Sequence, residues 1–222
     1  IFFWEWLHRF IGRAIGLVFI IPFLYFIITR QLDKSTIKKT IILLILGSFQ
    51  GFLGWYMVKS GLVDRPDVSH YRLAAHLTTA FVTFAFTLWV ALDLIFPIKQ
   101  TINKTYRNLI RIGLAILFIQ IIYGAFVAGL DAGFIHNHWP MMSEGKFMHE
   151  TVLTEKTPVY KNFIEGRSGV QFVHRILAFI VVISIAIIYI KGKKIAVSNH
   201  QLNGLNSLLI LVGIQSLLGV LA

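Results

Sequence analysis

Six long apolar stretches dominate this sequence and leave few folds open to it. A helix needs about 20 mostly apolar residues to cross the hydrocarbon core of a bilayer. Three stretches contain no charged residue, namely 41–58, 112–130 and 201–222. Three more are equally apolar apart from a few ionisable side chains, namely 4–29, 77–96 and 170–190. Only 14% of all residues are charged, against about a quarter in soluble domains. We therefore predict an all-α, polytopic membrane protein in which six spans are present.

Basic residues gather in alternate loops between these stretches. Residues 30–40 hold four Lys or Arg, residues 97–111 hold four with no acid, and residues 191–200 hold three. The loops at 59–69 and 131–169 balance basic with acidic side chains. Because cytoplasmic loops carry the excess of Lys and Arg, we expect the two balanced loops to face outward. The net charge of +11 then reflects membrane topology, and we predict no nucleic-acid partner.

Cysteine is absent, which excludes a disulfide, a thiolate metal site and a cysteine nucleophile within this sequence.

Two motifs recur at nearly one offset. Glu5-Trp-Leu-His8-Arg9 returns 166 residues later as Gln171-Phe-Val-His174-Arg175, and Gln50-Gly-Phe-Leu-Gly54 returns 165 residues later as Gln215-Ser-Leu-Leu-Gly219. Such repeats relate two halves of a membrane protein, although motifs this short also arise by chance. The repeat predicts two tandem pseudo-symmetric four-helix bundles, at residues 1–100 and 101–222, with six of eight helices present. We expect one further helix beyond each end.

Three histidines lie a turn or two inside a span, at its outer end. They are His8, His76 and His174. An ionisable group inside a span is rare and points to function. The spans of His8 and His76 run parallel, so the two imidazoles can approach one haem iron from opposite sides. His174 would begin the equivalent pair in the second half. The alternative is that these are interfacial histidines bonded to backbone carbonyls.

Arginines accompany the predicted metal ligands. They are Arg9, Arg13, Arg72 and Arg175. Placement toward the bundle next to an anion would offset the cost of burying them, and haem propionates are suitable partners. The alternative is that these side chains reach the lipid headgroups.

The remaining histidines receive no role from the sequence. His136, His138 and His149 lie in the long outer loop without carboxylates at helical spacing, so no metal site is predicted there. We expect His70 and His200, at span edges, to face water.

Glu5 and Gln171 occupy equivalent places in the repeat, each three residues before its histidine. Because a carboxyl group can exchange protons and an amide cannot, we expect the reaction site in the first half and a permanently bound cofactor in the second. A salt bridge to Arg9 is the alternative for Glu5.

Five motifs in order complete the pattern. They are Glu5-Trp-Leu-His-Arg-Phe-Ile-Gly-Arg13, Gln50-Gly-Phe-Leu-Gly-Trp-Tyr-Met-Val-Lys-Ser-Gly61, Tyr71-Arg-Leu-Ala-Ala-His76, Val127-Ala-Gly-Leu-Asp-Ala-Gly133 and Val170-Gln-Phe-Val-His-Arg175. Together they resemble the haem A synthase family, in the branch shared by alphaproteobacteria and mitochondria.

The resemblance implies a cofactor haem b with His174 as one axial ligand, and a substrate haem O flanked by His8 and His76 with Glu5 near its reacting edge. It implies oxidation of the C8 methyl of haem O to a formyl group by successive hydroxylations, with water as the oxygen source. It also implies a bacterial or mitochondrial inner membrane, the histidines toward the outer side, and work beside haem O synthase in supplying terminal oxidases. Some members carry a cysteine pair that this sequence lacks.

Two other functions fit the histidines. A dihaem b-type electron carrier needs the same ligands, and a transporter built from repeats could use histidines as a proton relay. The sequence leaves open the electron acceptor and whether the chain forms a homo-oligomer.

Overall fold

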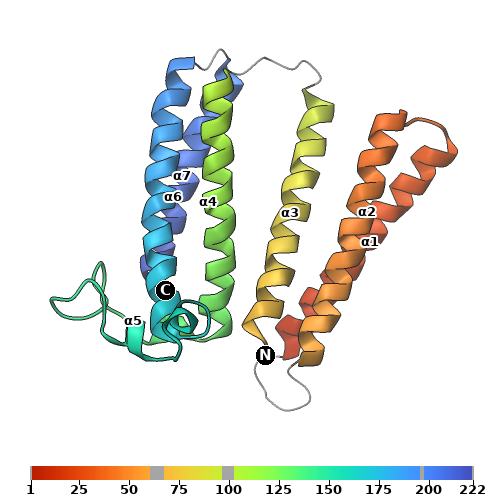
Figure 1. Cartoon of the computed structure of the whole chain (residues 1–222). Helices are drawn as coiled ribbons and strands as arrows, with labels where there is room; N and C mark the ends of the chain where they lie inside the picture. The colour runs from red at the N-terminus through yellow and green to blue at the C-terminus, as the bar shows by residue number, and fades with distance from the viewer. Residues whose placement is uncertain (1, 61–67, 97–102, 196–197, 222) are drawn as a thin grey trace. The chain divides into compact units, whose positions relative to one another are not determined.

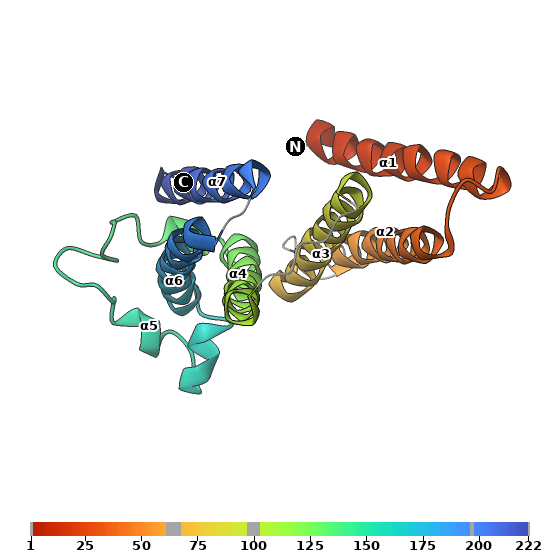
Figure 2. The same ribbon diagram turned by 90° about the horizontal axis from the view of Figure 1, so that it is seen from above.

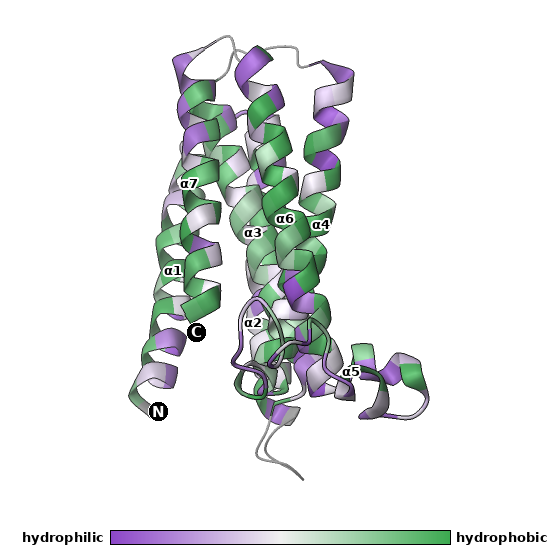
Figure 3. Ribbon diagram, turned by 90° about the vertical axis from the view of Figure 1, so that its left-hand side faces the viewer, coloured by the Kyte–Doolittle hydropathy of each residue, from purple (hydrophilic) through white to green (hydrophobic). Residues whose placement is uncertain are grey.

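The computed structural model describes residues 2–60, 68–96, 103–195 and 198–221, and these residues form helices and loops without a β-strand (Figure 1). The six long helices are α1 (Phe2–Ile28), α2 (Lys34–Ser60), α3 (His70–Ile95), α4 (Lys104–Gly129), α6 (Arg167–Ile195) and α7 (Asn199–Leu221). Each is long and apolar enough to cross a membrane, and the hydrophilic residues concentrate toward the helix ends (Figure 3). The prediction of an all-α, multi-pass membrane protein is confirmed.

Several helices begin well before their apolar stretch. α2 starts at Lys34, seven residues ahead of the stretch at 41–58. The Asp33 carboxylate accepts hydrogen bonds from the backbone N–H groups of Ser35 and Thr36, at 3.0 and 3.3 Å. These bonds satisfy donors that a helix start otherwise leaves open. Hydrogen bonding from Thr36 also holds the pKa of Asp33 below its usual value. The helix therefore extends through a polar turn that hydropathy alone does not assign to it.

The chain divides into two compact units. The first comprises Ile1–Pro66 and Thr78–Lys99, and the second comprises Asp67–Leu77 and Gln100–Ala222. The predicted boundary at residue 100 lies outside the described residues, as do parts of three predicted loops, at 61–67, 97–102 and 196–197. The pseudo-symmetry of two four-helix bundles stays a prediction.

In the first unit α1 packs against α2, and a part-buried ion pair joins α2 to α3. The ammonium of Lys39 binds the carboxylate of Asp93, and the two side chains are 23% and 14% exposed. The same ammonium lies 5.6 Å from the centre of the Trp89 ring. The opposite charge and the aromatic ring both offset the free-energy cost of burying these two ionisable groups between helices.

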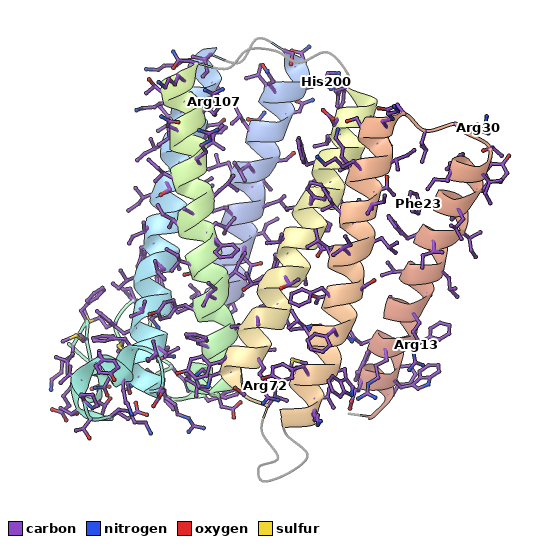
Figure 4. All side chains as sticks on the ribbon, turned by 45° about the vertical axis from the view of Figure 1, so that its right-hand side comes forward. Arg13, Phe23, Arg30, Arg72, Arg107 and His200 are labelled. Atoms are coloured by element: carbon purple, nitrogen blue, oxygen red, sulfur yellow. The ribbon has the colours of Figure 1, made fainter. Side chains whose placement is uncertain are left out.

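In the second unit α6 packs against both α4 and α7 (Figure 2). One apolar cluster contains Ala125, Phe126 and Val170, near the end of α4 and the start of α6. A second cluster contains Val181, Ile185 and Ile188, further along α6. Within this unit Arg107 and His200 lie at one end of the helices, and Arg72 lies at the other (Figure 4).

The loop between α4 and α6, residues 130–166, is held in shape by hydrogen bonds to a buried asparagine side chain. It contains three short helices, η1 (Ala132–Phe134), α5 (Thr151–Thr154) and η2 (Val159–Phe163). Asn162 is 0% exposed, and its amide donates to the carbonyls of Leu153, Lys156 and Val159. Its Oδ1 accepts from the backbone N–H of Lys156 at 2.6 Å. Because all of its hydrogen-bonding atoms are used inside the loop, Asn162 fixes the loop's shape without a β-sheet.

This loop is also tied to the start of α6. The carboxylate of Glu155 accepts hydrogen bonds from the backbone N–H groups of Arg167 and Ser168, each at 3.0 Å. A carboxylate at a helix N-terminus satisfies open donors and complements the positive end of the helix dipole. The Nε of Arg167 in turn donates to the carbonyl of Leu130 at 2.7 Å, so both ends of the loop are held together.

Candidate functional site

His174 lies on α6 and faces α4. Its Nε2 is 3.4 Å from the Nε2 of Gln120, and its ring lies against Gly124. A Cβ placed on residue 124 would stand 3.3 Å from Cε1 of His174. Gln120 and Gly124 are four residues apart and therefore share one face of α4. The motif Gln-x-x-x-Gly thus places an amide beside the imidazole and leaves room for the ring.

The surroundings of the His174 imidazole are suited to a metal-binding histidine. The Nδ1 of His174 is buried and has no hydrogen-bond partner among the described residues, and the same holds for the Oε1 of Gln120. When Nε2 accepts from the Gln120 amide, Nδ1 carries the proton, and binding of iron at Nε2 would replace this hydrogen bond. A lone pair on a neutral imidazole in apolar surroundings is what haem iron takes as an axial ligand. The residues present at His174 fit the predicted group.

Two side chains next to His174 hold the α4–α6 loop. The guanidinium of Arg175 donates to the backbone carbonyls of His138 and Met141, at 2.8 and 3.0 Å, and also to that of His136. The amide of Gln171 donates to the carbonyl of His136 at 3.2 Å. Arg175, predicted as a propionate partner, therefore has contacts that anchor the loop. Its role toward a cofactor stays a prediction.

The first copy of the motif lies near the start of α1. Glu5 and Arg9 form an ion pair one helical turn apart, both about half exposed, which is the alternative that the sequence left open for Glu5. His8 and Arg13 are also exposed. These residues belong to the first unit, whereas Arg72 and His76 on α3 belong to the second. Joint coordination of one iron by His8 and His76 stays a prediction.

His70 does not face water, contrary to the sequence-based expectation. Its ring stands edge-on to Phe126, with centroids 5.2 Å apart, and its Nε2 is buried. A Cβ on residue 129 would lie 2.7 Å from the Cβ of His70. Gly129 therefore allows the start of α3 to approach the end of α4. Periodicity could not reveal this contact, because His70 and Gly129 are 59 positions apart in the sequence.

Two of the three loop histidines, His136 and His149, to which the sequence assigned no role, line a pocket of about 240 Å³. The rings of His136 and His149 lie 4.7 Å apart, and Thr151, Glu155, Arg167 and Ser168 complete the polar lining. Burial lowers the pKa of His136, and the nearby charges of His149 and Arg175 lower it further against the opposing effect of Glu155. The described residues contain no group of three or more His, Cys, Asp or Glu side chains that could hold a metal ion.

A larger cavity of about 590 Å³ lies between α4, α6 and α7 in the second unit. Aliphatic side chains line most of it, and its polar residues are Asn103, Tyr106 and Gln201. None of its lining residues is a His, Asp or Glu, so we do not assign the reaction to this cavity although it is the larger of the two. The chemistry-bearing groups of this unit lie around His174 and in the loop pocket.

Comparison with known proteins identifies the family of this chain. The family model COX15-CtaA, described as cytochrome oxidase assembly protein, matches residues 1–222. The protein named Heme A synthase of Flavobacterium johnsoniae is 62% identical over 222 residues, which cover 99% of this chain and 65% of that protein. The protein of the same name from Flavobacterium psychrophilum is 62% identical over 221 residues, covering 100% of this chain and 65% of that protein. Heme A synthase of Nitrosospira multiformis is 41% identical over 224 residues, covering 99% and 62%.

The chain therefore spans 65% of the length of its two 62%-identical relatives. A match over all residues, together with the histidine motifs on α1 and α6, settles the family. The chain belongs to the COX15-CtaA family of cytochrome oxidase assembly proteins.

Proposed function

We propose that the complete protein is a haem A synthase, an oxidoreductase that converts haem O to haem A. The observation that carries this proposal is the setting of His174, a buried imidazole with its ring against Gly124 and its Nε2 beside the Gln120 amide. Relatives 62% identical to the chain bear the name Heme A synthase, which supports the same activity.

In this proposal His174 binds haem b in the second unit, and His8 and His76 hold haem O. When bound, haem b supplies one-electron redox chemistry that carries electrons away from the substrate. Gln120 orients the His174 imidazole, and Arg175 holds the loop beside it. Arg9, Arg13 and Arg72 would neutralise propionates, which favours a fixed position of the macrocycle.

The proposed reaction turns the C8 methyl group and one water molecule into a formyl group, four protons and four electrons. A proton acceptor near the reacting edge is therefore required at each hydroxylation. Glu5 is the proposed acceptor, because the equivalent position of the repeat holds the neutral amide of Gln171. The ion pair with Arg9 would keep the Glu5 side chain in a defined orientation between proton transfers.

The proposed setting is the inner membrane of a bacterium or mitochondrion, with the histidines toward its outer face. Haem O synthase would supply the substrate, and an electron acceptor as yet unnamed would reoxidise the protein. Assembly into a homo-oligomer is compatible with this proposal and not required by it.

The test is to express the full-length protein with a haem O supply and identify the extracted porphyrins by chromatography. The unaltered protein should yield haem A and haem b. Glu5→Gln should retain both bound haems but lose most haem A formation, whereas Glu144→Gln, which alters an exposed carboxylate in the α4–α6 loop, should leave it unchanged.

Three results would contradict parts of the proposal. Haem b with unmodified haem O would indicate a dihaem electron carrier. A purified protein without haem would favour a transporter. Unchanged turnover in Glu5→Gln would remove Glu5 from the reaction.

A further inference from the structure

The α4–α6 loop contains a short hairpin, residues 138–149, with a defined backbone. The N–H of Met142 donates to the carbonyl of Lys146 at 3.2 Å, and the N–H of Lys146 donates to the carbonyl of Ser143 at 3.1 Å. Gly145 lies in the turn with φ of +69°, a left-handed conformation that glycine adopts readily. The Met142 side chain is 1% exposed, so the hairpin has one side that is buried against the protein.

The other side of this hairpin is apolar and exposed. Four large side chains there are from 41% to 56% exposed, namely Trp139, Met141, Phe147 and Met148. Burial of such surface is favourable, and exposed apolar surface concentrated in one short segment indicates an interaction with a partner or a membrane.

Contacts with α6 set the position of the hairpin along that helix. The Arg175 guanidinium donates to the carbonyls of His138 and Met141, and the Phe147 ring stands edge-on to Phe172 with centroids 6.1 Å apart. Phe172 and Arg175 both lie inside the apolar stretch 170–190. Because an α-helix rises about 1.5 Å per residue, they lie roughly 8 and 12 Å from its first residue, Arg167. The loop therefore folds back beside the end of α6 instead of extending away from it (Figure 1).

The face of α6 that the hairpin contacts points away from the helix packing. Phe172 precedes His174 by two residues, which places it about 200° around the helix axis and so on the opposite face. Phe179 and Ile183 share the face of Phe172, and both are exposed. The apolar surface of the hairpin thus continues into an exposed apolar stripe of a helix that is long and apolar enough to cross a membrane.

We propose that this hairpin is an interfacial membrane anchor, in which Trp139, Met141 and Phe147 enter the boundary between the headgroups and acyl chains of the adjoining leaflet. Aromatic side chains are enriched at this boundary. Two features limit the depth of entry. The non-helical backbone of the hairpin has to reach water, and Glu144 and Lys146 at the turn have to stay among the headgroups. Because these two charges are opposite, the anchor requires no anionic lipid.

The first experiment measures the surroundings of the hairpin in a bilayer. Full-length protein is placed in phosphatidylcholine vesicles with a nitroxide on one introduced cysteine, and residues 1–222 contribute no other thiol. The label in Met141→Cys and in Met148→Cys should collide more often with oxygen, which concentrates among acyl chains, than with a water-soluble nickel chelate. Lys156→Cys, at an exposed loop position outside the hairpin, is the control and should show the reverse preference. Added phosphatidylglycerol should change neither ratio.

Two results of this experiment would overturn the anchor. More collisions with the nickel chelate at both hairpin positions would place the hairpin in water. Few collisions with either reagent would mean that protein covers it, either a second copy or another part of the full-length chain. The anchor is independent of the proposed haem chemistry, so loss of haem A formation bears on the proposed function and not on these ratios.

The second experiment tests whether α6 sets the depth of the hairpin. Phe172→Ala removes the ring against which Phe147 packs, so the Met141→Cys label should lose part of its preference for oxygen. Ile183→Ala truncates an exposed side chain further along the same face and should leave the ratio unchanged. Circular dichroism should show equal helix content in both variants. Equal oxygen-to-nickel ratios in the two variants would refute the role of α6 in holding the hairpin at the interface.

Discussion

Gly124 lies directly against the imidazole of His174, so that a Cβ at residue 124 would stand 3.3 Å from the ring's Cε1 atom. Such a contact is tighter than van der Waals packing normally allows, and the ring would have to move by a few tenths of an ångström. The glycine on α4 therefore helps to set the orientation of the predicted ligand on α6.

Substitution of Gly124 should reduce haem binding in proportion to side-chain size. Gly124→Ala should lower haem b occupancy of the full-length protein modestly, and Gly124→Val should lower it strongly, because the larger side chain occupies the space of the ring. The haem-to-protein absorbance ratio measures this effect. Gly213→Ala, where a Cβ meets nothing within 4 Å, is the matched control. Full occupancy in Gly124→Val would show that the imidazole does not need this position.

Loss of the Asn162 side chain should open the α4–α6 loop. Asn162→Ala removes four hydrogen bonds inside a buried turn and should destabilise the loop by about 3 kcal/mol. Gly169→Ala should act in the same direction, because its Cβ would lie 2.2 Å from the carbonyl oxygen of Asn162. Limited proteolysis reports loop opening, and Asn137→Ala, an exposed loop position, serves as the control. A protease pattern identical to that of the control would refute this account.

Breaking the Lys39–Asp93 ion pair should destabilise the first unit. Asp93→Asn leaves a part-buried ammonium without its carboxylate, and we expect a loss of about 1–3 kcal/mol in detergent or lipid. Lys39→Met combined with Asp93→Leu should recover much of this loss, because neither charge then needs a partner. Thermal unfolding measures both effects, with Lys38→Met at an exposed position for comparison. If Lys39→Met and Asp93→Leu, each measured alone, gave losses that simply add in the double variant, a direct interaction would be refuted.

Acidification should loosen the α4–α6 loop. Burial lowers the pKa of His136 below its ordinary value near 6.5, so the open loop binds a proton more readily than the closed loop. Loop stability should therefore be constant well above pH 6.5 and fall as the pH drops below that value. Amide hydrogen exchange within residues 130–166 measures the opening. His136→Gln should flatten this dependence, and an unchanged slope in that variant would place the titrating group elsewhere.

The sequence predicted the helices better than it predicted their ends. Long apolar stretches, three of them without any charge, identified all six long helices, because a bilayer span needs apolar length. The start of α2 at Lys34 was missed since its first turns are basic and depend on the Asp33 cap, a local hydrogen bond that hydropathy does not register. A helix boundary of this kind is determined by hydrogen bonds from the capping side chain.

The same distinction applies to the candidate site. His174 was identified because an ionisable residue in an apolar span stands out, and Gln120 and Gly124 have the same spacing as Gln50 and Gly54 of the repeat. Their contact joins residues 54 positions apart and required the packing of α4 on α6. The sequence assigned no role to His136 and His149, and it could not show their link, because that link runs through Thr151 and through Ser168 at the start of α6.

Adjacent residues on an α-helix point about 100° apart, and α6 uses this angle to give neighbours different surroundings. His174 packs against α4, whereas Arg175 donates hydrogen bonds to three backbone carbonyls of the α4–α6 loop. Two adjacent residues therefore have side chains in different surroundings, one between the helices and one against the loop. A displacement of those carbonyls would therefore act on the helix backbone directly beside the imidazole, so the conformation of the loop and the orientation of His174 are coupled through α6.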